Sequence, residues 1–215
     1  MSELGAASAR SPIAEGIFAH WPNRITALRF VGSLVLFTIL SLYGELPREE
    51  IGPYVEISFW LFIAIAATDY LDGYLARRGN QITAFGRIAD PFVDKVLIMG
   101  VMVFLAVLPW TQRWFSAWIV VVILAREFLV TGLRGYVESL GSQFPADWFG
   151  KIKMILQCSA VGVVLGIHAF DFPSGLNRLL EWTALFLVYA TLATTLLSCL
   201  IYLSKTRQLL LGRST

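Results

Sequence analysis

Hydrophobic residues along this chain gather in six long blocks, separated by short segments rich in polar and charged residues. The blocks cover residues 25–43, 57–76, 91–110, 115–137, 152–170 and 179–203. Most are close to the ~20 residues that an α-helix needs to cross the hydrocarbon core of a bilayer. The pattern therefore predicts an all-α, polytopic membrane protein with six transmembrane helices, which form one membrane domain over residues 25–205.

Two shorter segments flank the predicted domain. Residues 1–24 are expected to be a tail and a juxtamembrane segment, in which Ile13, Ile17, Phe18 and Trp21 predict an amphipathic helix on the membrane surface. Residues 206–215 are expected to be a cytoplasmic tail. The first 24 residues lack a compact apolar stretch with a small-residue cleavage site, so no cleaved signal peptide is expected. Without a targeting extension, a bacterial inner membrane is favoured.

Composition agrees with a membrane location. Hydrophobic residues make up 57% of the 215 residues and the mean hydropathy is +0.68, which is more apolar than an ordinary soluble domain. The two cysteines, Cys158 and Cys199, lie within apolar blocks and lack metal-ligand spacing. They are interpreted as small core residues rather than as a disulfide or a reactive thiol.

Basic residues divide unevenly between the two sides of the predicted bundle. Fourteen of the 17 lysines and arginines fall on one side, whereas only Arg48, Arg113 and Arg178 fall on the other. Cytoplasmic loops of membrane proteins carry such an excess of positive charge. The distribution predicts that the N and C termini are both cytoplasmic.

Four aspartates occur in and beside the apolar blocks, in the frame Asp69-x2-Asp72-Gly73-x2-Ala76-Arg77-x8-Gly86-x3-Asp90-x3-Asp94. Residues three or four positions apart share one face of a helix. Two antiparallel helices with a short cytoplasmic connection can therefore direct all four carboxylates into one pocket. Such oxygen ligands favour Mg²⁺, Mn²⁺ or Ca²⁺ over zinc.

Small and basic residues accompany the aspartates. Gly73, Gly86 and Ala76 would allow a bulky ligand to approach the backbone, and Arg77 can bind phosphate oxygens. The combination indicates a site for a nucleotide diphosphate. Two other interpretations are weaker: structural ion pairs with nearby arginines and lysines, and a cation transport path. The carboxylates cluster near one membrane face, which argues against transport.

The frame over residues 69–94 resembles the signature of the CDP-alcohol phosphotransferases at every defining position, and six helices match that family's fold. The resemblance implies a homodimer with a cytosol-facing polar cavity and Mg²⁺ or Mn²⁺, as two divalent ions, as cofactor. It implies that Asp69, Asp72 and Asp90 bind metal, and that Asp94 is a metal neighbour and the general base. The implied CDP-binding residues are Asp69, Gly73, Ala76, Arg77 and Gly86.

The second half of the chain bears on which alcohol is used. Arg126 and Arg134 are eight positions apart, near one helix face, and Lys151 and Lys153 follow at the start of the fifth block. Four cations favour an anionic acceptor such as a phosphomonoester. The positive-inside rule and attraction to anionic lipids are the plainer explanation of these cations. Glu127 is expected to orient an arginine.

Segments 22–29, 126–134 and 150–157 are similar to those of family members that use glycerol 3-phosphate. That resemblance implies transfer of the phosphatidyl group from CDP-diacylglycerol to glycerol 3-phosphate, with Arg126, Arg134, Lys151 and Lys153 holding the acceptor. Inositol phosphate, phosphatidylglycerol and serine are alternative acceptors. A cation transporter and a non-catalytic scaffold are the alternatives from other classes. Asn23 and Thr26 are expected to cap the first helix rather than to reach the nucleotide.

Overall fold

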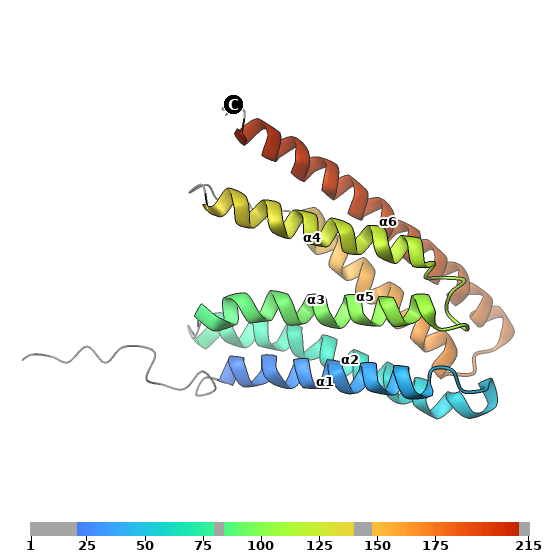
Figure 1. The fold of residues 1–215 in the computed structure, drawn as a ribbon. Helices are drawn as coiled ribbons and strands as arrows, with labels where there is room; N and C mark the ends of the chain where they lie inside the picture. The colour runs from blue at the N-terminus through green and yellow to red at the C-terminus, as the bar shows by residue number, and fades with distance from the viewer. Residues whose placement is uncertain (1–20, 80–83, 140–147, 211–215) are drawn as a thin grey trace, which may run out of the picture.

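The computed structural model describes residues 21–79, 84–139 and 148–210. Within these ranges it describes the backbone but not the side chains of residues 21–22, 48, 69–79, 84–88, 90, 148–149, 151 and 208–210. The described residues form six α-helices and no strand. The helices are α1 (Trp21–Tyr43), α2 (Arg48–Gly79), α3 (Ala84–Val107), α4 (Ala117–Ser139), α5 (Trp148–Ala169) and α6 (Ser174–Leu210) (Figure 1).

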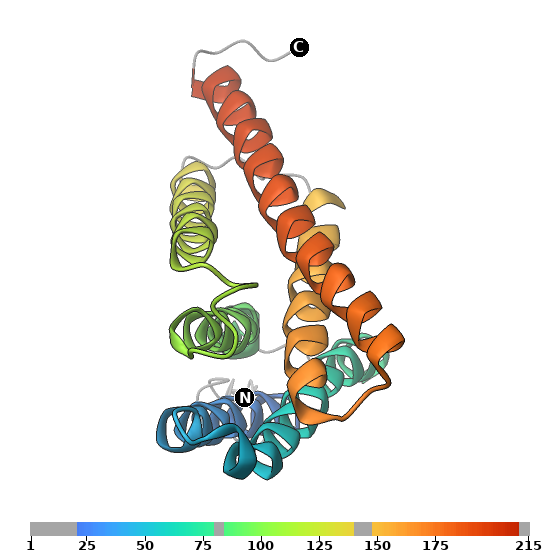
Figure 2. The same ribbon diagram turned by 90° about the vertical axis from the view of Figure 1, so that its right-hand side faces the viewer.

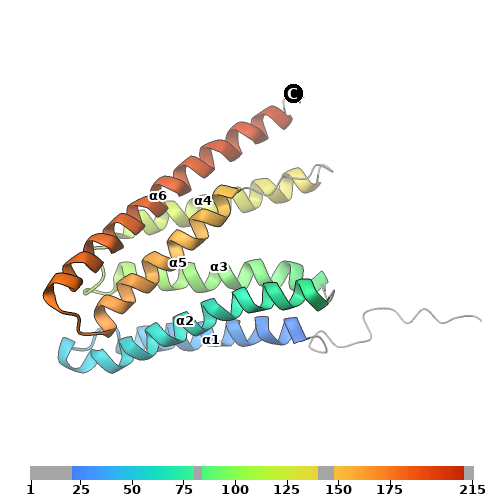
Figure 3. The same ribbon diagram turned by 180° about the vertical axis from the view of Figure 1, so that it is seen from behind.

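The helices pack in a closed ring of contacts: α1 with α2, α2 with α5, α5 with α6, α6 with α4, α4 with α3, and α3 with α1. An additional contact joins α3 to α5. In Figures 1 and 3, α1 lies beside α2 and beside α3, both of which contact it, whereas α6 is inclined to α1. Seen from the end, α1 and α2 form a layer at the bottom of the bundle (Figure 2). Helix α4 and the upper part of α6 lie apart from this layer.

Four segments are long and apolar enough to cross a membrane: Asn23–Tyr43, Glu49–Thr68, Ile152–Ala169 and Ser174–Arg207. They lie in α1, α2, α5 and α6. Within the described residues, α3 and α4 do not meet the same requirement, although they contain 24 and 23 residues. Both carry charged residues within their length, including Asp94 and Lys95 in α3 and Arg126 and Glu127 in α4. The prediction of six long helices is confirmed, and the prediction that all six cross the membrane remains a prediction.

Several helices extend beyond their predicted limits. α2 begins at Arg48 and ends at Gly79, and α6 continues from Ser174 to Leu210. α3 begins at Ala84, seven residues before the apolar block, because the polar turns that carry the aspartates are also helical. The predicted amphipathic helix at 13–23 falls almost wholly outside the described residues, and its last three residues belong to α1. The division at residues 24 and 205 remains a prediction.

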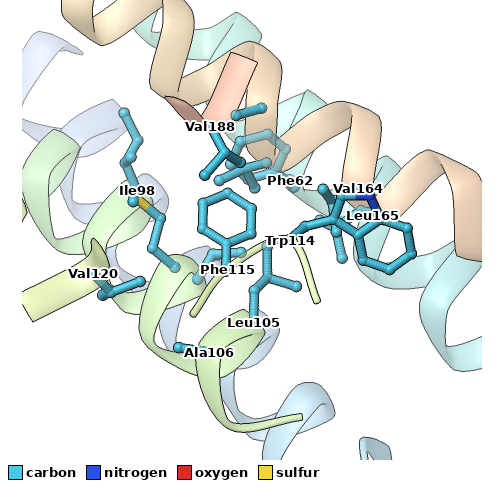
Figure 4. Packing of buried hydrophobic residues seen from close by; sticks show 14 of the residues in the cluster. Phe62, Ile98, Leu105, Ala106, Trp114, Phe115, Val120, Val164, Leu165 and Val188 are labelled. Carbon is cyan, nitrogen blue, oxygen red and sulfur yellow. The ribbon is translucent and has the colours of Figure 1, made fainter. Parts of the chain in front are cut away.

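The hydrophobic core lies toward the end of the bundle where α3 connects to α4. Trp114 and Phe115, from that connection, are 3% and 1% exposed and project among buried residues of several helices (Figure 4). Phe62 of α2 and Leu165 of α5 belong to the same cluster. Buried charged side chains belong instead to the parts of the helices at the opposite end. The apolar end thus holds the helices together, and polar groups occupy the other end.

Close helix packing depends on glycines, because lipid tails are as apolar as the core and association must come from tight contact. A Cβ atom at Gly100 of α3 would overlap the ring of Phe37 on α1. That ring also stacks on Phe104, with 5.7 Å between ring centroids. Gly100 therefore sets the closest approach of α1 to α3 in this region.

We predict that Gly100→Ala destabilises the protein by about 1–3 kcal/mol, since the Phe37 ring must shift out of its packed position. Gly162→Ala in α5 is the matched control, because the nearest atoms to its added Cβ would be 3.9 Å away, an ordinary contact. Thermal unfolding of both variants in the same detergent measures the difference. Equal midpoints for the two variants would contradict the packing argument.

Candidate active site

The aspartate frame lies on two consecutive helices at one end of the bundle. The last turns of α2 carry Asp69 and Asp72, and the first turns of α3 carry Asp90 and Asp94. Only four residues separate the end of α2 from the start of α3, so both segments lie at the same end (Figure 1). The predicted placement on two antiparallel helices is confirmed. The helices are held by common neighbours, because both pack on α1 and on α5.

Most side chains of the frame lie outside the described part of the structure. This applies to the predicted metal and CDP residues Asp69, Asp72, Gly73, Ala76, Arg77, Gly86 and Asp90. Among the described residues, no group of three His, Cys, Asp or Glu side chains could hold a metal ion. The predicted metal site therefore depends on carboxylates whose backbone positions alone are described. Carboxylates offer only oxygen ligands, and such ligands fit Mg²⁺ or Mn²⁺.

Asp94 is the frame's one aspartate with a described side chain, and it is paired. Nη1 of Arg29 on α1 donates a hydrogen bond to Oδ1 of Asp94 at 2.7 Å. The Arg29 side chain is 3% exposed and that of Asp94 is 22% exposed. A buried guanidinium requires an anionic or acceptor partner, because desolvation of an unpaired charge is costly. The contact fixes the direction of the carboxylate and keeps it accessible.

Polar residues line the same face of α1. Asn23 and Thr26 precede Arg29 at intervals of three and are 1% and 3% exposed. One turn after Arg29, the hydroxyl of Ser33 donates to the Arg29 carbonyl at 2.8 Å. Because α1 begins at Trp21, Asn23 and Thr26 lie within the helix and are buried. The expectation that they cap the helix is therefore wrong.

A small cavity of about 30 Å³ opens beside the Arg29–Asp94 pair. Its polar part is formed by these two residues. The remaining lining comes from α2, α3 and α5: Ile65, Ala66, Val93, Leu97, Ile98, Met154 and Cys158. The pocket therefore places a carboxylate next to an apolar wall. Cys158 contributes to this wall, in keeping with its interpretation as a small apolar residue.

A second charged group is organised around Glu127 on α4. Its Oε1 accepts a hydrogen bond from Nη1 of Arg126 at 2.7 Å and one from Nζ of Lys153 on α5. All three side chains are nearly buried, at 6–7% exposed. Nζ of Lys95 on α3 lies 3.9 Å from the other oxygen, Oε2. We call Arg126, Glu127, Lys153 and Lys95 the Glu127 cluster.

Two residues of α6 hold the arginines of α4. Ser198 accepts a hydrogen bond from Nη2 of Arg126, and the hydroxyl of Tyr202 accepts one from Nη2 of Arg134 at 2.5 Å. Both guanidinium carbons also lie 5.8 Å from the centroid of the Tyr202 ring. Cations are attracted to the face of an aromatic ring at such distances. The two arginines therefore converge on one aromatic residue despite being eight positions apart in the sequence.

The predicted acceptor cations are brought together in part. Arg126 and Lys153 share Glu127, and Arg134 is linked to Arg126 through Tyr202. The side chain of Lys151 lies outside the described residues. Sequence reasoning missed Arg29, Lys95, Ser198 and Tyr202 as neighbours of these sites. The spacing of Asn23, Thr26 and Arg29 on one helix face was the available signal for Arg29.

A family comparison bears directly on these sites. The family model described as CDP-alcohol phosphatidyltransferase matches residues 19–203. The chain belongs to this family. The match covers the aspartate frame, the Arg29–Asp94 pair and the Glu127 cluster. This family membership confirms the resemblance on which the sequence analysis relied.

Similar curated proteins are named CDP-diacylglycerol–glycerol-3-phosphate 3-phosphatidyltransferase. The Bacillus subtilis protein is 35% identical over 156 residues, which are 70% of this chain and 78% of the relative. The Haemophilus influenzae protein is 30% identical over 187 residues, covering 85% and 90%. The Escherichia coli protein is 35% identical over 197 residues, covering 89% and 97%. Similarity therefore extends over most of each chain.

We predict that Glu127→Gln destabilises this family member by about 3 kcal/mol, since it leaves Arg126 and Lys153 buried without an anion. Glu181→Gln is the control, because its bond to Arg113 joins side chains 29% and 58% exposed. That surface pair should contribute less than about 1 kcal/mol. Denaturant unfolding in detergent compares the two. An effect of Glu127→Gln no larger than that of Glu181→Gln would contradict this assignment.

Proposed function

We propose that this protein transfers the phosphatidyl group of CDP-diacylglycerol to sn-glycerol 3-phosphate, giving phosphatidylglycerophosphate and CMP. The named relatives, similar over most of their length, support the reaction. The observation that carries the choice of acceptor is the Glu127 cluster, in which three cations converge on one carboxylate. Its excess positive charge suits an acceptor that carries a phosphate, whereas serine or a neutral alcohol would gain little from it.

The chain's own residues account for the transfer step. Asp94 accepts the proton of the acceptor's primary hydroxyl, and Arg29 holds this carboxylate in position. The hydroxyl oxygen then forms a bond to the phosphorus that carries diacylglycerol. The bond from that phosphorus to the oxygen of CMP breaks, and CMP leaves with the electron pair.

Asp69, Asp72, Asp90 and Asp94 would hold Mg²⁺ or Mn²⁺, as two divalent ions. When bound, such ions neutralise charge on the diphosphate and on the departing CMP. Gly73, Ala76, Arg77 and Gly86, together with Asp69, would line the CDP site. The frame's spacing on α2 and α3 supports this assignment. Arg126, Arg134, Lys151 and Lys153 would hold the acceptor phosphate.

The donor requires an apolar path for its acyl chains. The pocket beside Asp94 offers an apolar wall formed by α2, α3 and α5, so the diacylglycerol part would lie against it. We place all six helices across a bacterial inner membrane, with both termini and the active site on the cytoplasmic side. The segment 13–23 would lie at the membrane surface, and the protein would act as a homodimer.

We predict that the purified protein releases CMP from CDP-diacylglycerol with Mg²⁺ or Mn²⁺ only when glycerol 3-phosphate is supplied. Inositol phosphate, serine and phosphatidylglycerol would be offered in parallel assays. CMP release with one of these, but not with glycerol 3-phosphate, would contradict the proposed acceptor and leave the proposed site of chemistry intact. Release without any alcohol would indicate hydrolysis instead of transfer.

We predict that Asp94→Asn lowers kcat by about a hundredfold or more, because the amide cannot take the proton. Binding of CDP-diacylglycerol should be largely retained. Asp171→Asn, in the connection between α5 and α6 at the opposite end of the bundle, is the control and should turn over normally. Turnover of Asp94→Asn at the rate of the unmodified protein would remove Asp94 from the role of base.

A further inference from the structure

No individual role in the reaction has yet been assigned to Lys95. It follows Asp94 directly in α3, and its Nζ donates a hydrogen bond to Oγ1 of Thr131 on α4 at 2.7 Å. Its side chain is 41% exposed, compared with 7% for Arg126 and 6% for Lys153. Lys95 is therefore the accessible cation of the Glu127 cluster.

The charges of the cluster are unequal. Three basic side chains, those of Arg126, Lys153 and Lys95, face the one carboxylate of Glu127. Arg126 and Lys153 make direct hydrogen bonds to Glu127, whereas Lys95 remains 3.9 Å from it, beyond hydrogen-bonding distance. A lysine ammonium has three donors, and the described hydrogen bonds use one of them, on Thr131. Lys95 can therefore bind an anion without breaking up the buried pairs.

Lys95 and Asp94 start from adjacent positions of α3. Neighbouring residues of a helix point about 100° apart, and their Cα atoms are about 3.8 Å apart. Asp94 accordingly contacts Arg29 of α1, and Lys95 contacts Thr131 of α4. The five single bonds from the reacting oxygen of glycerol 3-phosphate to its phosphorus span roughly 6 Å when extended. In the arrangement proposed below, one acceptor molecule would bridge these two side chains.

We propose that Lys95 binds the phosphate of the acceptor directly and thereby places the acceptor's hydroxyl at Asp94. This inference rests on the proposed function and adds a substrate contact from the helix that carries the base. Lys95 determines specificity for a phosphorylated alcohol, because the phosphate contact and the hydroxyl contact come from adjacent residues of α3. The cations of α4 and α5 would complete the phosphate site from the other side.

A purely structural role for Lys95 leads to a different expectation. The hydrogen bond to Thr131 joins α3 to α4, and its loss alone would loosen that contact. Thr131→Val removes the acceptor of this bond and keeps the ammonium. Lys95→Met removes the ammonium and keeps most of the side-chain volume. The two variants thus separate the charge of Lys95 from its link between the helices.

The test measures initial rates of CMP release in mixed micelles for the full-length protein and for Lys95→Met, Lys95→Arg and Thr131→Val. Lys95→Met should raise the KM for glycerol 3-phosphate about tenfold or more, since a charge-assisted hydrogen bond is lost. The KM for CDP-diacylglycerol and the Mg²⁺ dependence should change less than about twofold. Lys95→Arg should recover part of the loss, and Thr131→Val should behave almost as the unmodified protein.

A second measurement on the unmodified protein does not require any variant to fold. Glycerol 3-phosphate should slow acetylation of the Lys95 amine, followed by mass spectrometry, whereas glycerol should not. Equal KM values for glycerol 3-phosphate in Lys95→Met and unmodified protein, or a Thr131→Val variant as impaired as Lys95→Met, would overturn the proposal. So would acetylation of Lys95 at the same rate with and without glycerol 3-phosphate. Failure of the unmodified protein to use glycerol 3-phosphate would instead overturn the proposed function.

Discussion

The burial of a single carboxylate, that of Glu127, constrains the functional half of this molecule. An unpaired charge within an apolar bundle is expensive, so Glu127 must be surrounded by cations. Arg126 and Lys153 meet this requirement with direct hydrogen bonds, and Lys95 approaches from α3. The pairing joins α3, α4 and α5 at one point. Under the proposed function, this gathering of basic side chains would prepare the site for an anionic acceptor.

The two ends of the helix bundle have different roles. At one end, Trp114 and Phe115 anchor the connection between α3 and α4 in an apolar core. At the other end, the same α3 carries Asp94 toward α1 and Lys95 toward α4. This helix therefore belongs to both the aspartate frame and the Glu127 cluster. A donor held at the aspartates and an acceptor held at the cations would meet along it.

The sequence predicted the six helices, the placement of the aspartate frame on two of them and the grouping of Arg126 with Lys153, because these depend on local periodicity and spacing. It did not predict contacts between distant segments. Arg29 and Asp94 are 65 positions apart, and Arg126 and Ser198 are 72 apart. Such pairs depend on the order in which the helices pack, which hydrophobic blocks alone do not specify. The limits of the helices were also predicted incorrectly, because apolar blocks do not mark polar helical turns. In α3, such turns come before the apolar block.

The most direct test is a solid-state NMR measurement of distances between the phosphorus of bound glycerol 3-phosphate and lysine Nζ atoms labelled with ¹⁵N. The chain has four lysines, Lys95, Lys151, Lys153 and Lys205, so the spectrum should be tractable. The account predicts strong ³¹P dephasing of a lysine signal that disappears in Lys95→Met. A dephasing pattern that is unchanged in Lys95→Met, or no dephasing of any lysine, would contradict an acceptor phosphate held beside Asp94.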